Sequence, residues 1–264
     1  MIKICNKISK KNIEKLTKPI VFNCKDYKLN SKLSGKNIKM AIIDSGYPTH
    51  PILNKASEIT SFCENSDTYK DKFGHSSLVS GIISSNSKKS IIGVAPKTKI
   101  YYSKAVDDNG NCCFNALLAS ILWAITKKVN IIVLALGSQI HYPILHDAIK
   151  KAFYNNICII SASGNDIKNK EIDYPSRYPE VLSIGAKTRS SIYNKVLKEQ
   201  SSLVVQKSSM FTTFLDDKYV KASGSSIATA FVAGIASLLI EDSINKSKKY
   251  TNLEIYEDLK KIKF

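Results

Sequence analysis

Residues 39–46 read KMAIIDSG, a short apolar run that ends on an aspartate, a serine and a glycine. Such a run predicts a buried parallel strand, and open α/β sheets place their functional side chains at the carboxyl ends of these strands. Asp44 ends this run, His75 follows a glycine further along, and Ser226 opens an apolar helical pattern. An acid, a base and a hydroxyl nucleophile are the three groups that acyl transfer needs, so their presence in this order is the first indication of function.

The rest of the chain alternates short apolar runs with helical patterns, which predicts a mostly parallel sheet covered by helices on both faces. We expect strands at residues 38–43, 100–105, 131–136, 157–162 and 181–186, and helices at residues 75–85, 115–128, 145–155, 226–240 and 252–262. Residues 188–221 show no clear periodicity. The predicted fold class is therefore α/β, with three layers.

The net charge of +17 is carried almost wholly by lysine, since Arg177 and Arg189 are the only arginines. Dispersed lysines usually serve solvation, and the functional alternative is attraction to an acidic partner. Nucleic-acid binding normally shows arginine forks or aromatic residues along a basic stripe. The sequence has neither, so we expect no nucleic-acid partner and favour an acidic peptide.

The chain has 264 residues, 44% of them hydrophobic, which is enough for one sizeable core. No apolar run reaches the roughly 18 residues of a membrane span, and the lysine-rich N-terminus lacks the apolar stretch of a secretory signal. We therefore expect a cytoplasmic protein with no membrane contact.

The chain has six cysteines and no CxxC pair, which predicts neither a zinc site nor a disulfide framework. Cys158 lies in an apolar run and is interpreted as a core residue.

Each of the three reactive residues also has an ordinary structural interpretation. The segment around Asp44 can be a simple turn, His75 can be a structural residue at a helix start, and Ser226 can be a helix N-cap. The sequence that surrounds each residue decides between these interpretations.

The segments around these residues resemble blocks of the subtilisin-like serine proteases. Residues 224–234, GSSIATAFVAG, are similar to the nucleophile block Gly-Thr-Ser-Met-Ala-Thr-Pro-His-Val-Ala-Gly. Residues 75–81, HSSLVSG, resemble the block His-Gly-Thr-His-Val-Ala-Gly, and residues 41–46 resemble the block that carries the catalytic aspartate. Further matches lie in family order at residues 93–96, 161–165 and 174–179. We expect a catalytic domain at residues 33–264 and an N-terminal extension at residues 1–32.

The resemblance implies a subtilisin-like fold and an acyl-enzyme mechanism. Ser226 would attack the scissile carbonyl, His75 would take and return the proton, and Asp44 would fix the imidazole. Asn165 would donate its side-chain amide to the oxyanion. Four residues would form an edge strand that pairs with the substrate backbone, namely Leu134, Ala135, Leu136 and Gly137.

The resemblance also places a pocket for the residue before the cut beside Ser163 and Gly164. Where the family often has a small residue at the base of this pocket, the chain has Asp173, and Asp166 follows at the rim. A carboxylate in a partly desolvated pocket favours a cationic guest, so we expect cleavage after Arg or Lys. The alternative is that Asp173 points to solvent in a loop of different length.

Two departures from the family pattern concern packing rather than catalytic atoms. The common Pro-His after the nucleophile is Ala230-Phe231, and residues 76–78 read Ser-Ser-Leu instead of Gly-Thr-His.

Where relatives often carry a calcium loop, residues 86–90 read NSKKS, and two ammonium groups oppose a divalent cation. We therefore expect no metal and no cofactor.

Together these features predict a monomeric serine endopeptidase that acts on a peptide or precursor-protein substrate. Lanthipeptide leader peptidases are a subtilase group with members that lack a secretory signal, and their acidic leaders would suit a basic enzyme. The alternatives are an intracellular degradative subtilisin, and an inactive module that captures peptides or nucleic acid.

Overall fold

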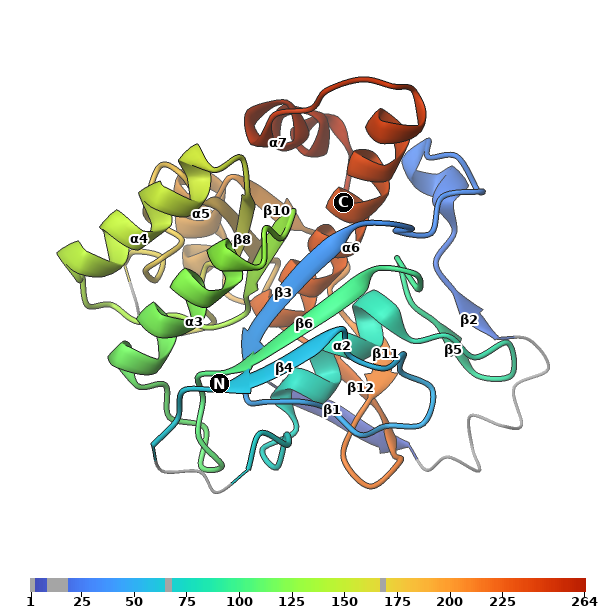
Figure 1. The fold of residues 1–264 in the computed structure, drawn as a ribbon, viewed down its shortest axis with the longest axis horizontal. Helices are drawn as coiled ribbons and strands as arrows, with labels where there is room; N and C mark the ends of the chain where they lie inside the picture. Colours follow the sequence, from blue (N-terminus) through green and yellow to red (C-terminus); the bar gives the residue numbers. More distant parts are fainter. Residues whose placement is uncertain (1–2, 9–18, 65–67, 167–169) are drawn as a thin grey trace.

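A computed structural model describes residues 3–8, 19–64, 68–166 and 170–264 (Figure 1). Its centre is a seven-stranded sheet with the order β10-β9-β8-β7-β3-β6-β4, in which neighbouring strands run parallel. These strands are β3 (Lys39–Asp44), β4 (Glu58–Ser61), β6 (Lys99–Lys104), β7 (Ile131–Leu134), β8 (Cys158–Ala162), β9 (Leu182–Ala186) and β10 (Leu203–Val205). The five predicted strands are all present, with ends that differ by one or two residues.

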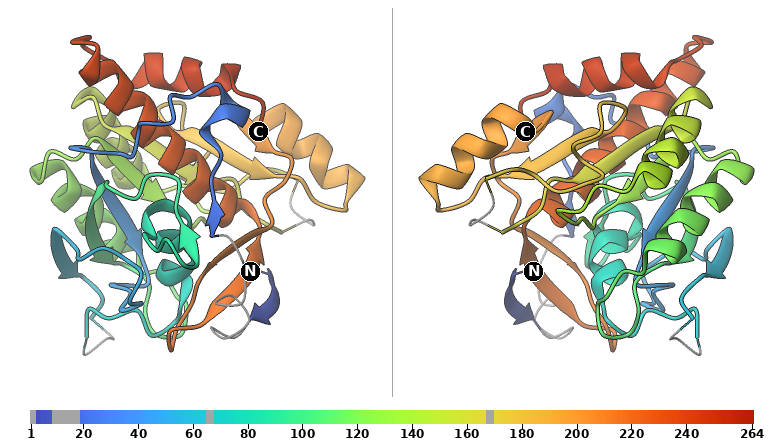
Figure 2. Two further views of the ribbon diagram at one scale, coloured as in Figure 1. Left: turned by 90° about the vertical axis from the view of Figure 1, so that its right-hand side faces the viewer. Right: turned by 90° about the vertical axis from the view of Figure 1, so that its left-hand side faces the viewer.

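Helices cover both faces of the sheet, as Figure 2 shows. On one face lie α2 (His75–Ser84), α6 (Ser225–Asn245) and α7 (Asn252–Lys261), and on the other lie α3 (Phe114–Thr126) and α4 (Pro143–Tyr154). The alternation along β3 produces these two cores, because Met40 and Ile42 pack with α2 and α6 while Ala41 and Ile43 pack with α3 and α4. The predicted three-layer α/β fold is confirmed.

The long helix α6 is buried along most of its length. It is the one described helix whose length and mean hydropathy would also suit a membrane span. However, 78% of its most apolar window is buried inside the protein. A helix that is apolar all round is typically a core helix, so burial accounts for the composition of α6.

Residues 188–221, where no pattern was evident, contain four short elements. They are α5 (Ser191–Gln200), β10, β11 (Met210–Thr213) and β12 (Tyr219–Ser223). The helix α5 buries only Tyr193 and Leu197, and strands of three to five residues are too short for a clear alternation. The strand β12 lies between β11 and β1 (Lys3–Ile8) in a separate antiparallel sheet.

Part of the predicted N-terminal extension packs onto the catalytic domain. The strand β2 (Ile20–Val21) pairs with β5 (Ile91–Ile92), and a 3-10 turn, η1 (Cys24–Tyr27), follows it. The rings of Phe22 and Tyr27 lie 5.4 Å and 5.5 Å from the ring of Phe231 in α6. The boundary between residues 32 and 33 stays a prediction.

Candidate active site

Asp44 and His75 form a buried pair where β3 ends and α2 begins. The imidazole Nδ1 lies 2.7 Å from Asp44 Oδ1 and 2.8 Å from Oδ2. Asp44 is 1% exposed and His75 8% exposed, so water screens this contact little. With Nδ1–H donating to the carboxylate, the neutral ring carries its free electron pair on Nε2, which is the arrangement that a general base requires.

Ser226 is the second residue of α6 and lies close to the end of β7. Its hydroxyl donates to the Ala135 carbonyl at 2.9 Å, and among the described residues this is its hydrogen-bond partner. The sequence predicted that His75 would accept this proton, and in the structure the hydroxyl instead points to the neighbouring strand end. Catalytic hydrogen bonds of free enzymes are often formed only when substrate binds.

Asn165 lies in the loop after β8 and faces the start of α6. The Ser225 N–H donates to Asn165 Oδ1 at 2.8 Å. This bond fixes the orientation of the amide through Oδ1, so Nδ2 is not used in it. The start of α6 adds unpaired backbone N–H groups and the positive end of a helix dipole. Asn165 is therefore held at the start of the helix that bears Ser226, and its role as an oxyanion donor stays a prediction.

A buried carboxylate that the sequence interpretation missed, Asp71, links the neighbours of both Asp44 and His75. Asp71 Oδ1 accepts from Ser45 Oγ at 2.8 Å and from the Gly74 N–H at 2.6 Å. Its Oδ2 accepts from the Ser77 N–H at 2.7 Å and from Ser77 Oγ at 2.6 Å. Asp71 thus fastens the turn after the catalytic acid to the helix start that carries the catalytic base. Its only sequence signal is its position four residues before His75.

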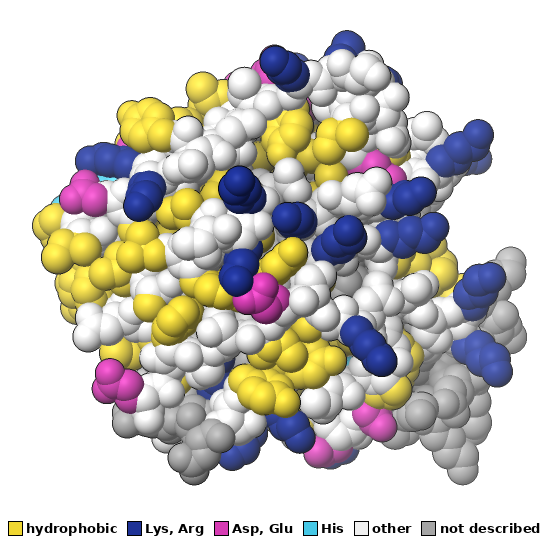
Figure 3. Space-filling model, viewed as in Figure 1, with side chains coloured by type: hydrophobic (Ala, Val, Ile, Leu, Met, Phe, Trp, Pro, Cys, Tyr) yellow, Lys and Arg dark blue, Asp and Glu magenta, His cyan; other side chains and the backbone are white. Residues whose placement is uncertain are grey.

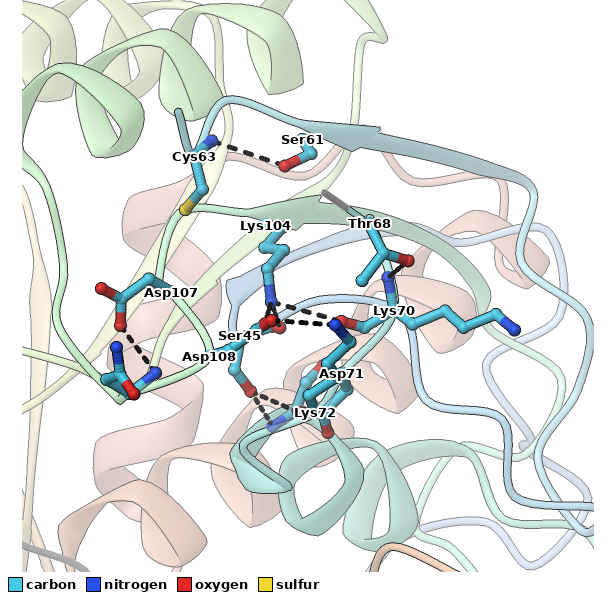
Figure 4. A network of polar contacts seen from close by, with 12 residues as sticks. Ser45, Ser61, Cys63, Thr68, Lys70, Asp71, Lys72, Lys104, Asp107 and Asp108 are labelled. Carbon is cyan, nitrogen blue, oxygen red and sulfur yellow. Dashed lines mark hydrogen bonds and ion pairs between the residues drawn. The ribbon is translucent and has the colours of Figure 1, made fainter. Parts of the chain in front are cut away.

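A second missed residue, Lys104, ends β6 directly beside Asp44 of β3. Its side chain is 0% exposed, and Nζ donates to the Ser45 carbonyl at 2.6 Å, the Lys70 carbonyl at 3.2 Å and Asp108 Oδ1 at 2.8 Å. Figure 4 shows these groups gathered around the end of β3. The available signal was a lysine at the end of the strand KIYYSK, directly before Ala105 and Val106, since a buried ammonium needs polar partners.

Three chain segments lie together where the sequence predicts the specificity pocket, a name that we keep for residues 135–137, residues 163–165 and Asp173. The Asp173 N–H donates to the Ser163 carbonyl at 2.9 Å, while Tyr174 and Ser138 exchange two backbone hydrogen bonds at 2.7 Å and 2.9 Å. The segment of Asp173 therefore lies between the other two. Leu134, predicted as part of the substrate strand, is the last residue of β7 and pairs with Ser161 of β8; Ala135 after it is also buried, and the chain becomes exposed at Gly137.

The carboxyl group of Asp173 lies between two pocket glycines. A Cβ built on Gly164 would meet Asp173 Oδ2 at 2.3 Å, and one on Gly137 would meet Asp173 Cβ at 2.7 Å. Burial raises the pKa of Asp173, and the negative charge of nearby Asp166 acts in the same direction. Asp166 itself is exposed after Asn165, where the sequence placed the pocket rim.

The described part of the chain contains no group of three or more His, Cys, Asp or Glu side chains that could hold a metal ion. Five cysteines are free thiols, namely Cys24, Cys63, Cys112, Cys113 and Cys158. The expected absence of calcium at residues 86–90 stays a prediction.

The family model of the subtilases matches residues 35–260. The chain is 33% identical to the minor extracellular protease Epr of Bacillus subtilis (strain 168) over 233 residues, which are 87% of this chain and 35% of Epr. It is 31% identical to an intracellular serine protease of Paenibacillus polymyxa over 267 residues, covering 94% of this chain and 78% of that protein.

Subtilisin E of Bacillus subtilis (strain 168) is 29% identical over 233 residues, with 86% of this chain and 60% of subtilisin E covered. The chain thus spans less than two thirds of the length of Epr and of subtilisin E. The six sequence blocks, the parallel sheet and the Asp44–His75 pair agree with the extent of the family match. The chain belongs to the subtilase family.

Proposed function

We propose that this subtilase is a serine endopeptidase that hydrolyses peptide bonds through an acyl-enzyme. The observation that carries the proposal is the buried contact of 2.7 Å between His75 Nδ1 and Asp44 Oδ1, formed beside the start of the helix that bears Ser226. Two of the three triad members are already in contact. The third, Ser226, donates to the Ala135 carbonyl and would have to break this bond to reach His75.

The residues would act in the following way. When substrate binds, Ser226 Oγ turns to His75 Nε2, gives up its proton and attacks the scissile carbonyl carbon. The oxyanion receives hydrogen bonds from Asn165 Nδ2 and from the backbone N–H of Ser226. The imidazolium is stabilised by Asp44 and protonates the leaving amine, after which water enters and the same steps release the acid.

The substrate side chain before the cut would be basic. The carboxylate of Asp173 lies at the base of the specificity pocket between Gly137 and Gly164, which supports this choice and not a solvent-facing loop. An ammonium or guanidinium group would replace water around a partly buried carboxylate and form a charge-assisted hydrogen bond. The substrate backbone would pair with residues 135–137, which follow the end of β7.

The biological substrate would be a dedicated acidic peptide, such as the leader of a lanthipeptide precursor, processed by a monomer in the cytoplasm. The net charge of +17 supports this choice. On the face seen in Figure 3, the Lys and Arg side chains are spread over the surface. Such a field accelerates encounter with an acidic partner, and the acceleration falls with ionic strength. A degradative intracellular subtilisin would act on mixed proteins without that salt dependence.

A fluorophosphonate probe tests the enzymatic proposal directly. We expect covalent labelling of the wild type and none of Ser226→Ala, together with loss of peptide hydrolysis in the variant. A wild-type chain that stays unlabelled at Ser226, while still binding peptides, would be the inactive peptide-capturing module. For the substrate, kcat/KM on an acidic leader peptide should fall steeply with added salt, and kcat/KM on a neutral peptide should not.

A further inference from the structure

We propose, building on the proposed cleavage after a basic residue, that Gln139 makes the specificity pocket select lysine over arginine. Gln139 follows the pocket segment 135–137 and was not singled out by the sequence. Its side-chain amide Nε2 donates to Asp173 Oδ1. One of the two oxygens of the pocket carboxylate is therefore occupied before substrate arrives.

Gln139 is itself held in place from the other side. Its Oε1 accepts from Arg177 Nη2. The guanidinium of Arg177 also donates to Glu171 Oε2 and to the Ile172 carbonyl, and it lies 4.8 Å from the ring centroid of Tyr174. Because this arginine is anchored by three other neighbours, the amide of Gln139 is kept in the orientation that points Nε2 at the carboxylate.

The second carboxylate oxygen, Asp173 Oδ2, faces the two glycines of the pocket walls. A Cβ on Gly164 would lie 2.3 Å from Oδ2 but 3.5 Å from Oδ1, and one on Gly137 would lie 3.3 Å from Oδ2. Within the described ranges, which exclude residues 167–169, Asp173 Oδ2 accepts no side-chain or backbone hydrogen bond. The pocket thus presents one carboxylate oxygen to a guest.

The two basic side chains use a carboxylate differently. The lysine ammonium is a compact point charge with rotatable donors, and it can bind a single oxygen with good geometry. The arginine guanidinium gains its advantage from two parallel hydrogen bonds to both oxygens of one carboxylate. Because Gln139 occupies Oδ1, arginine keeps its charge attraction but loses the second hydrogen bond unless it displaces the amide.

The test uses three fluorogenic peptides that differ only in the residue before the cut, which is Lys, Arg or Phe. For the wild type we expect kcat/KM for the Lys peptide to exceed kcat/KM for the Arg peptide about tenfold. This ratio corresponds to the free energy of one charge-assisted hydrogen bond, reduced because the pocket is partly solvated. In Gln139→Met, which keeps length without the amide, the Lys-to-Arg ratio of kcat/KM should fall to about one.

Gln206→Met is the matched control, because Gln206 is an exposed glutamine whose amide donates to the Val204 carbonyl, outside the specificity pocket. It should keep the wild-type ratio. Gln139→Ala serves as a second variant in case the methionine disturbs folding, which a thermal melt reports. Equal cleavage after Lys and Arg in both the wild type and the Gln139 variants would overturn the role of Gln139 and leave basic cleavage intact. A wild-type preference for Phe over both basic residues would instead overturn basic cleavage itself.

Discussion

Replacing Asp71 by asparagine should weaken both the fold and catalysis, because this carboxylate accepts hydrogen bonds from three residues that flank the catalytic acid and base. Asparagine keeps one acceptor oxygen and puts an NH₂ group in place of the other. Whichever way the amide is placed, one backbone N–H, of Gly74 or of Ser77, then faces a donor. The adjacent serine hydroxyl can reverse its direction, but the backbone N–H cannot.

The loss of stability in Asp71→Asn can be worked out from this one unsatisfied backbone N–H. One unsatisfied buried N–H costs about 1–3 kcal/mol, and the remaining bonds lose the extra strength that a charged acceptor gives them. We expect Asp71→Asn to lower the free energy of unfolding by about 3 kcal/mol, which corresponds to a fall in Tm of about 6–12 °C for a domain of this size. Looser positioning of Asp44 and His75 should lower kcat roughly tenfold, well short of the ~10⁴-fold loss expected when a catalytic aspartate becomes asparagine.

The assay combines a thermal melt with steady-state hydrolysis of one peptide, measured well below both melting temperatures. Asp147→Asn is the control, because the Asp147 side chain is 74% exposed and its ion pair with Lys150 is 3.6 Å long. An exposed pair of this kind contributes little, so this variant should match the wild type. The reasoning about Asp71 is wrong if Asp71→Asn melts within about 2 °C of the wild type and keeps its kcat.

Two further predictions concern the site itself. Asn165→Ala should lower kcat by about 10²–10³-fold with little change in KM, because the amide Nδ2 stabilises only the developing oxyanion, and a large rise in KM with unchanged kcat would contradict this role. Burial raises the pKa of Asp173, so its ionised form destabilises the folded protein at pH values above that raised pKa. Asp173→Asn should therefore have a higher Tm than the wild type at pH 7 while losing selectivity for basic residues, and the difference in Tm should shrink as the pH falls through the folded-state pKa. Equal melting curves at pH 7 would show that the carboxylate is well solvated.

The sequence predicted the central sheet and singled out Asp44 and Ser226 as catalytic candidates, because both kinds of feature leave local patterns. Buried strands such as β3 are apolar on both faces, and Asp44 and Ser226 stand at element boundaries, where short blocks of sequence are distinctive. The direction of the Ser226 hydroxyl could not be predicted, since a rotamer depends on neighbours such as Ala135 that are remote in sequence. The strands β10–β12 lie below the length at which alternation can be recognised.

The missed residues differ in how visible they were. Gln139 lies in an exposed loop where glutamine is unremarkable, and its contact with Asp173 exists only because two loops meet after the fold has formed. Asp71 stands in a polar stretch where an aspartate is ordinary turn composition. Lys104 is different, because it is a charged residue directly before Ala105 and Val106 and so conflicts with its buried environment.

That conflict is itself informative about the site. A methionine could fill the volume of Lys104 without the desolvation that a side chain with 0% exposure imposes on an ammonium group. The charge is compensated by Asp108, which Lys72 also contacts at 3.3 Å, and by two carbonyls, one of them from Ser45 directly after the catalytic acid. Residues that conflict with their local environment occur mainly at functional sites. The buried ammonium of Lys104 is therefore best explained by its hydrogen bond to the Ser45 carbonyl, which holds the turn after Asp44. The catalytic acid is thus positioned from two sides, by Lys104 through the Ser45 carbonyl and by Asp71 through the Ser45 hydroxyl.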